Sequence, residues 1–238
     1  MHVLFVYAHP EPKSFTHALL ETAYKEVERQ GLSYEVTDLY AQNFNPVAGR
    51  HDFTSVAQPD YFHYQTEQMY AAQHGTFAPD IAAEQEKVRK ADVLVFIFPL
   101  WGGGFPAILK GWFDRALAYG FSYVDGARFE RGLFKGRAAL ACIPTGGTIE
   151  RFSPGSTYGS IEQVLWPFTH CKLGYLGLDV TPPYIAYAAP RVGDEGRTKL
   201  LADWETYFGE FLADRAANHP ALPPLAPPET VTSWNSKA

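Results

Sequence analysis

Cysteine is scarce in this chain, which has only Cys142 and Cys171 among its 238 residues. The two do not have the spacing of metal ligands, and Cys142 falls inside an apolar run, so we expect buried, reduced thiols and no metal site. The chain also has no apolar stretch of about 18 residues and no basic segment followed by an apolar one at its start. We therefore expect a cytoplasmic protein without a membrane span.

Positive charge is not in excess either. The 20 lysines and arginines are outnumbered by 26 aspartates and glutamates, which gives a formal net charge of -6. Proteins that bind nucleic acid usually carry a basic face, so we expect no nucleic-acid partner. Any bound phosphate group would then depend largely on backbone N–H groups. Apolar residues, in contrast, make up 46% of the chain, which is enough for a large buried core.

Apolar runs alternate with helical periodicity along the chain. The runs predict strands near residues 3–7, 34–36, 93–98, 138–143 and 184–187. The periodic segments between and after them predict helices over residues 16–30, 82–90, 106–118, 161–171 and 197–216. Such alternation is typical of an α/β domain with a parallel sheet.

Two inserts and a tail interrupt this pattern. Residues 40–79 are rich in aromatic side chains and proline, which favours a packed excursion or a dimer arm over a disordered linker. Residues 119–135 form the second insert. We expect one domain over residues 1–217, followed by a proline-rich tail over residues 218–238 that is extended and lies on the surface or on a partner subunit.

A glycine-rich aromatic loop follows the third predicted strand, in the sequence Phe98-Pro99-Leu100-Trp101-Gly102-Gly103-Gly104-Phe105-Pro106. Ligands of parallel sheets bind beyond the carboxyl ends of the strands, so this is a candidate ligand loop. The glycines would let the main chain approach a flat ligand, and Trp101 and Phe105 offer ring surface. The alternative is an ordinary helix-entry turn with Pro106 at the first helical position.

Two further loops follow strands that would end at the same edge. In the first, His9, Lys13, Ser14 and Thr16 precede or open a helix, where N–H groups, the helix dipole and charge can hold a phosphate. Ordinary N-capping by Ser14 is the alternative. The other loop is Thr145-Gly146-Gly147-Thr148. A planar ring between the aromatic loop at Trp101 and this glycine-rich loop, with its phosphate at the first helix, is the arrangement that a flavin nucleotide requires.

Over residues 1–212 the chain resembles the NAD(P)H:quinone oxidoreductases of the flavodoxin-like fold. The resemblance is carried by Ala8-His9, Ser14-Phe15, Asp38-Leu39-Tyr40-Ala41, Asn43-Phe44-Asn45-Pro46, Phe98-Pro99-Leu100, Pro106-Ala107-Ile108-Leu109-Lys110-Gly111-Trp112-Phe113, Thr145-Gly146-Gly147 and Leu165-Trp166-Pro167. It implies a doubly wound five-stranded parallel sheet with helices on both faces and inserts that form an interface. It also implies a homodimer with the active site at that interface and one FAD per subunit. NADH or NADPH would reduce the FAD, and a quinone would then take two electrons.

The same resemblance implies roles for individual residues. His9, Ser14, Phe15 and Thr16 would hold the FAD phosphates and adjoining groups. The ring and ribityl chain would be bordered by Pro99, Leu100, Trp101 and Gly102. The polar edge of the ring would contact Thr145, Gly146 and Gly147, with Gly147 counted as catalytic, and Tyr123 would line the substrate pocket of the partner subunit.

Departures from the family pattern fall almost wholly in the expected active site. Gly102 and Gly103 stand where the family commonly has two aromatic residues. Phe152 and Tyr158 stand where its better-known members have a tyrosine and a histidine, so we expect both to line the substrate site and Tyr158 to be the catalytic hydrogen-bond donor. A neutral phenol in place of a cationic imidazole weakens charge stabilisation by about 1–3 kcal/mol. Asp125 replaces a second pocket tyrosine, which makes the substrate site more polar.

The leading hypothesis is therefore a flavin-dependent NAD(P)H oxidoreductase that acts on quinones or related azo or nitro aromatics. Two alternatives stay open, a flavin-binding regulatory or accessory subunit with weak turnover, and a reductase whose acceptor is not a quinone. The preference for FAD over FMN rests on the resemblance, and the sequence does not decide between NADH and NADPH.

Overall fold

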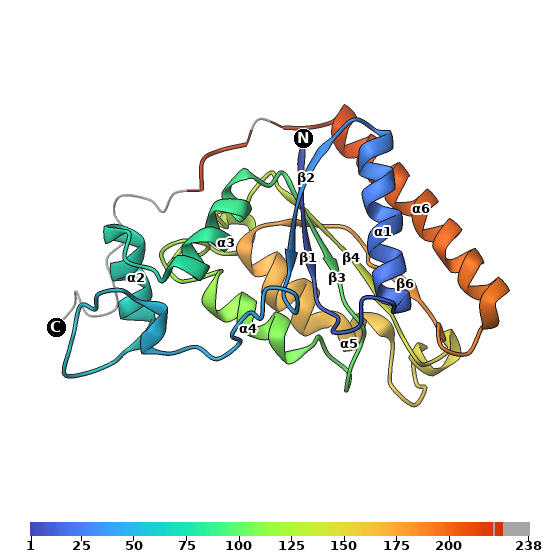
Figure 1. Ribbon diagram of the computed structural model, residues 1–238, viewed down its shortest axis with the longest axis horizontal. Coiled ribbons are helices and arrows are strands. Elements are labelled where there is room, and N and C mark those ends of the chain that lie inside the picture. Colours follow the sequence, from blue (N-terminus) through green and yellow to red (C-terminus); the bar gives the residue numbers. More distant parts are fainter. Residues whose placement is uncertain (221, 226–238) are drawn as a thin grey trace.

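A parallel sheet runs through the centre of the computed structural model, which describes residues 1–220 and 222–225 (Figure 1). Its strands are β1 (His2–Tyr7), β2 (Ser33–Asp38), β3 (Val93–Ile97), β4 (Ala138–Pro144), β5 (Asp179–Val180) and β6 (Tyr184–Ala186). The order is β2-β1-β3-β4-β5, and β6 pairs with β4 beyond β5. In register, Val3 lies opposite Tyr34 and Val93, and every pairing is parallel. The predicted five-position parallel sheet is confirmed.

The fifth position of the sheet is divided between two short strands. β5 pairs with the start of β4 and β6 with its end, and the residues between β5 and β6 include Pro182 and Pro183. A proline has no backbone N–H to donate, so a ladder of hydrogen bonds is interrupted there. The apolar run near residues 184–187 predicted only the second half of this strand position.

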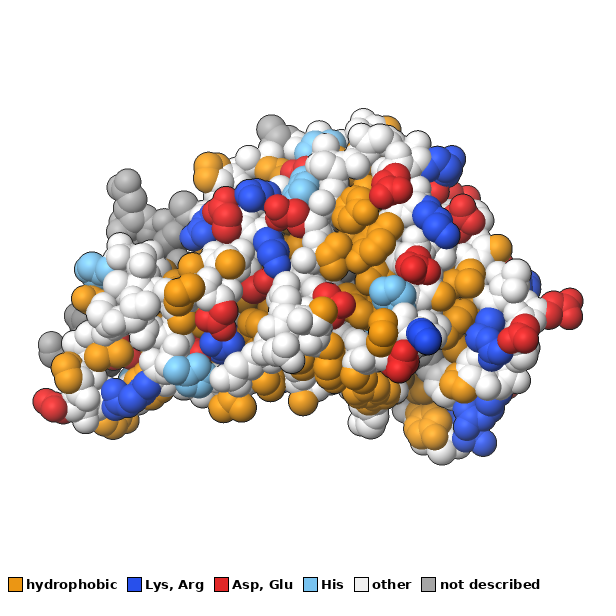
Figure 2. Space-filling view, viewed as in Figure 1, with side chains coloured by type: hydrophobic (Ala, Val, Ile, Leu, Met, Phe, Trp, Pro, Cys, Tyr) orange, Lys and Arg blue, Asp and Glu red, His pale blue; other side chains and the backbone are white. Residues whose placement is uncertain are grey.

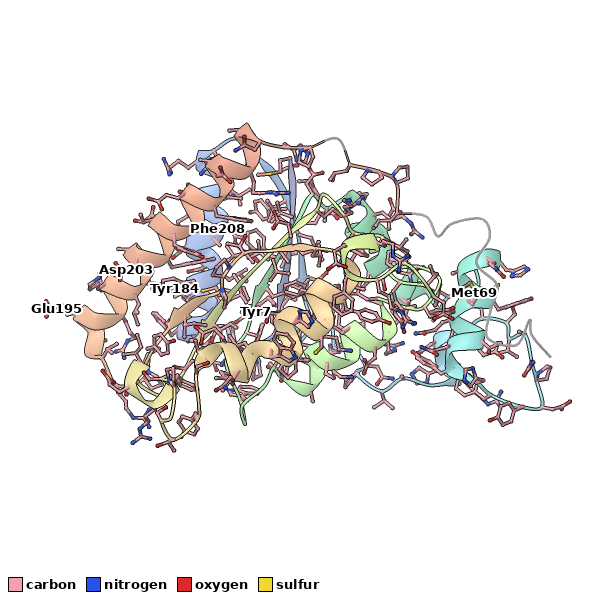
Figure 3. All side chains as sticks on the ribbon, turned by 180° about the vertical axis from the view of Figure 1, so that it is seen from behind. Tyr7, Met69, Tyr184, Glu195, Asp203 and Phe208 are labelled. Carbon is pink, nitrogen blue, oxygen red and sulfur yellow. The ribbon has the colours of Figure 1, made fainter. Side chains whose placement is uncertain are left out.

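Helices cover both faces of the sheet, as expected for a doubly wound fold. On one face, α1 (Phe15–Arg29) and α6 (Gly193–Ala217) pack against Val3 and Phe5. On the other, α3 (Pro79–Lys90), α4 (Ala107–Arg115) and α5 (Ile161–Phe168) pack against Leu4 and Val6. This division follows from the alternation of side chains along a strand. Figure 3 shows Phe208 and Tyr184 between α6 and the sheet, where the Tyr184 hydroxyl donates to the Leu200 carbonyl at 2.8 Å.

The expected helix over residues 161–171 begins as predicted but changes its geometry. Ser160 and Gln163 form a capping box at its start. After Phe168 the chain continues as a π-helix over Thr169–Gly174. Pro167 lies just before this change and contributes no N–H to the helix, which agrees with a locally altered hydrogen-bond pattern.

The first insert is folded and contains a helix that the periodicity did not predict. It holds a short 3-10 helix, Arg50–Asp52, and α2 (Tyr64–His74), which lies at the end of the molecule remote from α6 (Figure 1). The buried Glu67 carboxylate accepts hydrogen bonds from the amides of Ala57 at 2.6 Å and Gln58 at 3.1 Å. A Cβ on Gly111 of α4 would lie 2.3 Å from the Pro46 Cα, so glycine permits this close approach. The prediction of a packed excursion is confirmed.

The described part of the tail lies on the surface of its own chain. The Arg137 guanidinium donates to the Pro223 carbonyl at 3.2 Å, and Leu225 packs against the core beside Phe121. These contacts hold Pro223 and Leu225 against their own chain, and the extended proline-rich tail stays a prediction. The rest of the predicted tail, residues 226–238, lies outside the described residues, as does residue 221.

Two further expectations concern the cysteines and the membrane. Cys142 is buried in β4 as predicted, but Cys171 is exposed, because it belongs to the π-helix, of which only Leu173 is buried; the prediction for Cys171 was wrong. In the part of the chain that the structure describes, no helix combines the length and apolar character needed to cross a bilayer. The cytoplasmic location stays a prediction.

Candidate active site

Three loops meet at the carboxyl edge of the sheet. The amide of Ala8, directly after β1, donates to the Ile97 carbonyl of β3 at 3.1 Å. The amide of Leu100, in the loop after β3, donates to the Pro144 carbonyl of β4 at 3.1 Å. The rings of His9 and Trp101 lie 5.9 Å apart. The structure thus brings the loops after β1, β3 and β4 side by side, as their strand positions predicted.

The first loop ends in a capped helix N-terminus. The Ser14 hydroxyl oxygen accepts a hydrogen bond from the His17 amide at 3.1 Å, so the expected alternative of N-capping by Ser14 is confirmed. The first turn of α1 contains no acidic residue. Within residues 1–220 and 222–225, no group accepts from the amides of Phe15 and Thr16. This N-terminus therefore retains two donors and the positive end of a helix dipole for an anion.

The second loop is a tight hairpin that presents Trp101 to solvent. Trp101 and Gly104 exchange backbone hydrogen bonds at 2.9 and 3.0 Å, and Gly102 and Gly103 have φ of 56° and 79°. Two successive residues with positive φ are typical of a type I′ turn, which favours glycine. A Cβ on either glycine would meet nothing within 4 Å, so the turn and not a close contact within the chain explains them. Trp101 is 46% exposed.

The other residues of this loop differ in how far they are buried. Pro99 is buried, and Leu100 is half-buried. Phe105 packs against Phe98, Phe113 and Phe168 with ring centroids 5.5–6.3 Å apart. Phe105 is half-buried and packs on the margin of the aromatic core under α4 and α5, so only part of its ring surface remains open, and its contact with a ligand stays a prediction.

The third loop turns its carbonyl groups toward the segment between β6 and α6. The Thr145 carbonyl accepts from the Ala189 amide at 3.0 Å, and the Gly147 carbonyl accepts from the Ala188 amide at 2.8 Å. The Thr145 hydroxyl also donates to the Gly147 carbonyl at 2.8 Å. Among the described residues, none accepts from the amides of Gly146, Gly147 or Thr148. The loop therefore offers a row of three backbone donors.

An aromatic cluster stands beside this row of donors. Phe152 is buried and stacks on Tyr158 with ring centroids 5.0 Å apart and an angle of 28° between the rings. Tyr187 lies 6.0 Å from Phe152 on the other side. Tyr158 is 50% exposed, so its hydroxyl is accessible to a ligand. Phe152 and Tyr158 are thus brought together as expected, with Tyr158 on the solvent side.

Tyr123 and Asp125 make their contacts outside the Phe152–Tyr158 cluster. Tyr123 contributes to a cavity of about 410 Å³ lined by Tyr64, Gln65, Phe113, Lys172 and Tyr175 among others. The Gln65 amide group donates to the Tyr123 hydroxyl at 3.4 Å, and burial raises the pKa of this phenol.

Asp125 accepts hydrogen bonds from Arg128 at 2.5 Å and from the Tyr119 hydroxyl at 3.2 Å. Among the described residues, the ring contacts of Tyr123 are with Tyr119 and Tyr175 and not with Phe152 or Tyr158. Gln65 and Tyr175 in the cavity were not predicted, and no local signal marked them, because they come from segments far apart in the sequence.

Comparison with known proteins identifies the family. A family model described as flavodoxin-like fold matches residues 1–208. A relative from Pongo abelii, ribosyldihydronicotinamide dehydrogenase [quinone], is 41% identical over 85% of this chain and 88% of its own length. This chain belongs to the flavodoxin-like quinone dehydrogenase family. NAD(P)H dehydrogenase [quinone] 1 of Cavia porcellus is 37% identical over 85% of this chain and 74% of its own.

A comparison with a solved structure supports the same family assignment. A Klebsiella pneumoniae protein, provisionally named a quinone reductase, superposes with a TM-score of 0.84 at 33% identity, covering 94% of this chain and 86% of that one. The resemblance and the flavodoxin-like fold expected from the sequence are both confirmed.

A flavodoxin-like fold implies a flavin, and the residues at the carboxyl edge fit one. The free amides of Phe15 and Thr16 suit a phosphate group. The exposed Trp101 ring suits a flat ring system, and the amides of Gly146, Gly147 and Thr148 suit its polar edge. The donors and the aromatic surface are of the kinds such a cofactor needs, and they lie on neighbouring loops.

Proposed function

We propose that this protein is an oxidoreductase that binds FAD and passes two electrons from a dihydronicotinamide donor to a quinone or a related aromatic electrophile. The observation that carries the proposal is the convergence, in a member of this family, of two free amides at α1, an exposed Trp101 and three free amides after β4. Bound FAD would supply the redox chemistry itself. The protein supplies binding, orientation and electrostatics.

Each loop has a distinct task in this proposal. His9, Ser14, Phe15 and Thr16 hold the phosphates through the end of α1. Pro99, Leu100, Trp101 and Gly102 border the ring and ribityl chain. Gly146 and Gly147 bind the polar edge together with Thr148 through fixed N–H donors, which stabilise negative charge without reorganising. Thr145, whose own amide donates to the Ala186 carbonyl at 3.0 Å, borders the same edge and shapes the loop. Stacking in a defined geometry then brings donor and acceptor into reach.

Tyr158 is proposed to donate a hydrogen bond from its exposed hydroxyl, and Phe152 to support its ring from behind. Because a phenol is neutral at pH 7, it stabilises negative charge less than a cationic imidazole by about 1–3 kcal/mol. The phenol therefore slows the reaction relative to an imidazole without abolishing it.

A homodimer completes the proposed site. Tyr123 lines a cavity that includes neither Phe152 nor Tyr158, and Asp125 is bound to Arg128 and Tyr119, which supports a role for both in the pocket of a partner subunit. Figure 2 shows hydrophobic side chains gathered along the lower margin of that view, beneath α4 and α5. Exposed apolar surface of this kind is suited to an interface between copies of the chain.

Identification of the released cofactor is the first test. The purified protein is denatured, and the flavin in the supernatant is separated and compared with FAD and FMN standards. Recovery of FAD supports the proposal, recovery of FMN corrects its cofactor, and a protein that neither carries nor takes up a flavin overturns it.

Steady-state turnover is the second test. Oxidation of NADH, NADPH and ribosyldihydronicotinamide is followed with and without a benzoquinone, because the names of the relatives include both kinds of donor. Quinone-dependent oxidation of any donor supports the proposed enzyme. If no acceptor supports turnover of the flavin-loaded protein, the result would instead support the accessory-subunit alternative. Turnover with an azo or nitro aromatic, but not with the benzoquinone, would support the non-quinone reductase.

A further inference from the structure

The segment between β6 and α6 holds the loop after β4 by its carbonyl groups. Ala189 and Ala188 donate their amides to the carbonyls of Thr145 and Gly147 at 3.0 and 2.8 Å. The carbonyl between these two, that of Gly146, accepts from the guanidinium of Arg191. All three successive carbonyls therefore face the same neighbouring segment.

The planar peptides of this loop fix the direction in which its N–H groups point. In a planar trans peptide the N–H points opposite to the carbonyl of the preceding residue. The amides of Gly146, Gly147 and Thr148 therefore point away from the 188–191 segment. The middle amide, that of Gly147, belongs to the peptide whose carbonyl Arg191 holds.

Arg191 differs from the other two donors because it is charged. A guanidinium on a carbonyl oxygen makes a charge-assisted hydrogen bond, which is stronger than a neutral one and polarises the peptide toward a more positive N–H. The Arg191 amide in turn donates to the Ala188 carbonyl at 2.7 Å, so the backbone that carries the Arg191 side chain is part of a hydrogen-bonded turn. The described contacts thus connect one positive charge to one free N–H of the site.

We infer that Arg191 is a positioning residue that orients and polarises the Gly147 amide, and thereby supplies part of the positive potential that a neutral Tyr158 lacks. The inference rests on the proposed flavin site. It assigns Arg191 no contact with the ligand, since the residue acts through the Gly146–Gly147 peptide.

The test compares Arg191→Ala and Arg191→Lys with the wild type. Flavin affinity is measured by titration of the apoprotein, and the midpoint potential of the bound flavin by equilibration with a reference dye. In Arg191→Ala we expect reduced flavin to lose about tenfold more affinity than oxidised flavin, which lowers the potential by about 30 mV for a two-electron couple. Arg191→Lys, which keeps the charge, restores at least half of that shift.

Lys199→Ala is the matched control, because Lys199 is an exposed cation of α6 paired with Asp203 and has no contact with the β4 loop. It leaves affinity and potential unchanged. If the midpoint potential of the flavin in Arg191→Ala equals that of the wild type, even with weaker flavin binding, Arg191 is a structural residue. This result would overturn the inference but not the proposed function. Failure of the wild type to bind flavin would overturn the proposed function and this inference with it.

Discussion

Arg115 of α4 donates a hydrogen bond from Nε to Asp52 Oδ1 at 2.8 Å, and both side chains are buried. The same guanidinium reaches the Asn45 carbonyl at 2.7 Å and Asp80 at 2.9 Å. Tyr64 of α2 donates its hydroxyl to the other Asp52 oxygen at 2.6 Å. One arginine thus fastens the first insert to the helix that follows the Trp101 loop.

Replacing Arg115 by methionine is expected to lower the free energy of unfolding by about 3–5 kcal/mol, because the Asp52 carboxylate would stay buried without its charged partner. Urea unfolding followed by circular dichroism measures the change. Lys110→Met is the control on the same helix, since its pair with Asp114 is exposed and contributes about 1 kcal/mol or less. Equal small losses in both variants would contradict the proposed importance of the buried pair.

The hairpin at Trp101 gives a second prediction. Gly103→Ala is expected to destabilise the protein by about 1–2 kcal/mol, because alanine is strained at a positive φ. Gly104→Ala makes the same chemical change next to it without a positive φ and with open space around the new Cβ, so its effect stays within about 0.5 kcal/mol. Thermal unfolding of both variants checks this. A Gly104→Ala variant as unstable as Gly103→Ala would disprove the turn explanation.

Tyr158 can be tested without changing the shape of the site. Tyr158→Phe removes one neutral hydrogen bond and is expected to slow flavin reduction between about two- and tenfold, measured by stopped-flow absorbance. Tyr158→His is expected to be faster than Tyr158→Phe below pH of about 6.5, where an imidazole is charged. Tyr34→Phe on the far strand β2 is the control. An unchanged rate in Tyr158→Phe would remove Tyr158 from its proposed role.

Buried tyrosines predict a loss of stability at alkaline pH. Burial raises the pKa of Tyr7 to about 12 and also raises those of Tyr24 and Tyr184. An unfolded phenol titrates near pH 10, so between about pH 10 and 12 the unfolded chain binds fewer protons than the folded one, and stability falls as pH rises. Urea unfolding at pH 9 and pH 11 measures the fall. Tyr24→Phe would reduce it, and an equal fall in that variant would argue against this cause.

The two thiols are expected to react differently. Burial raises the pKa of the Cys142 thiol well above its usual range, whereas Cys171 is exposed. In the native protein at pH 8 a thiol reagent should label one cysteine, and in denaturant both. Cys171→Ser would abolish the native labelling. Rapid native labelling of that variant would show that Cys142 is accessible.

The helix α2 shows why part of the fold escaped prediction. Its buried positions include Thr66, Glu67 and Gln68, so it has no apolar stripe of helical period. Gln68 donates to the Asp114 carbonyl at 3.0 Å and accepts from the Tyr119 amide at 3.1 Å. A helix whose buried face is polar is stable only when distant residues satisfy it, and periodicity cannot reveal such partners.

By itself the sequence determined the parallel α/β sheet, the family and the three loops at one edge. It could do so because strand alternation and capping are local patterns, and because the ends of parallel strands share an edge. Only the tertiary structure packed Phe105 against the core, and placed Cys171 on the surface and Arg191 on the Gly146 carbonyl. These outcomes depend on how side chains and peptides are oriented by contacts with residues distant in the sequence, and a local sequence pattern does not contain that information.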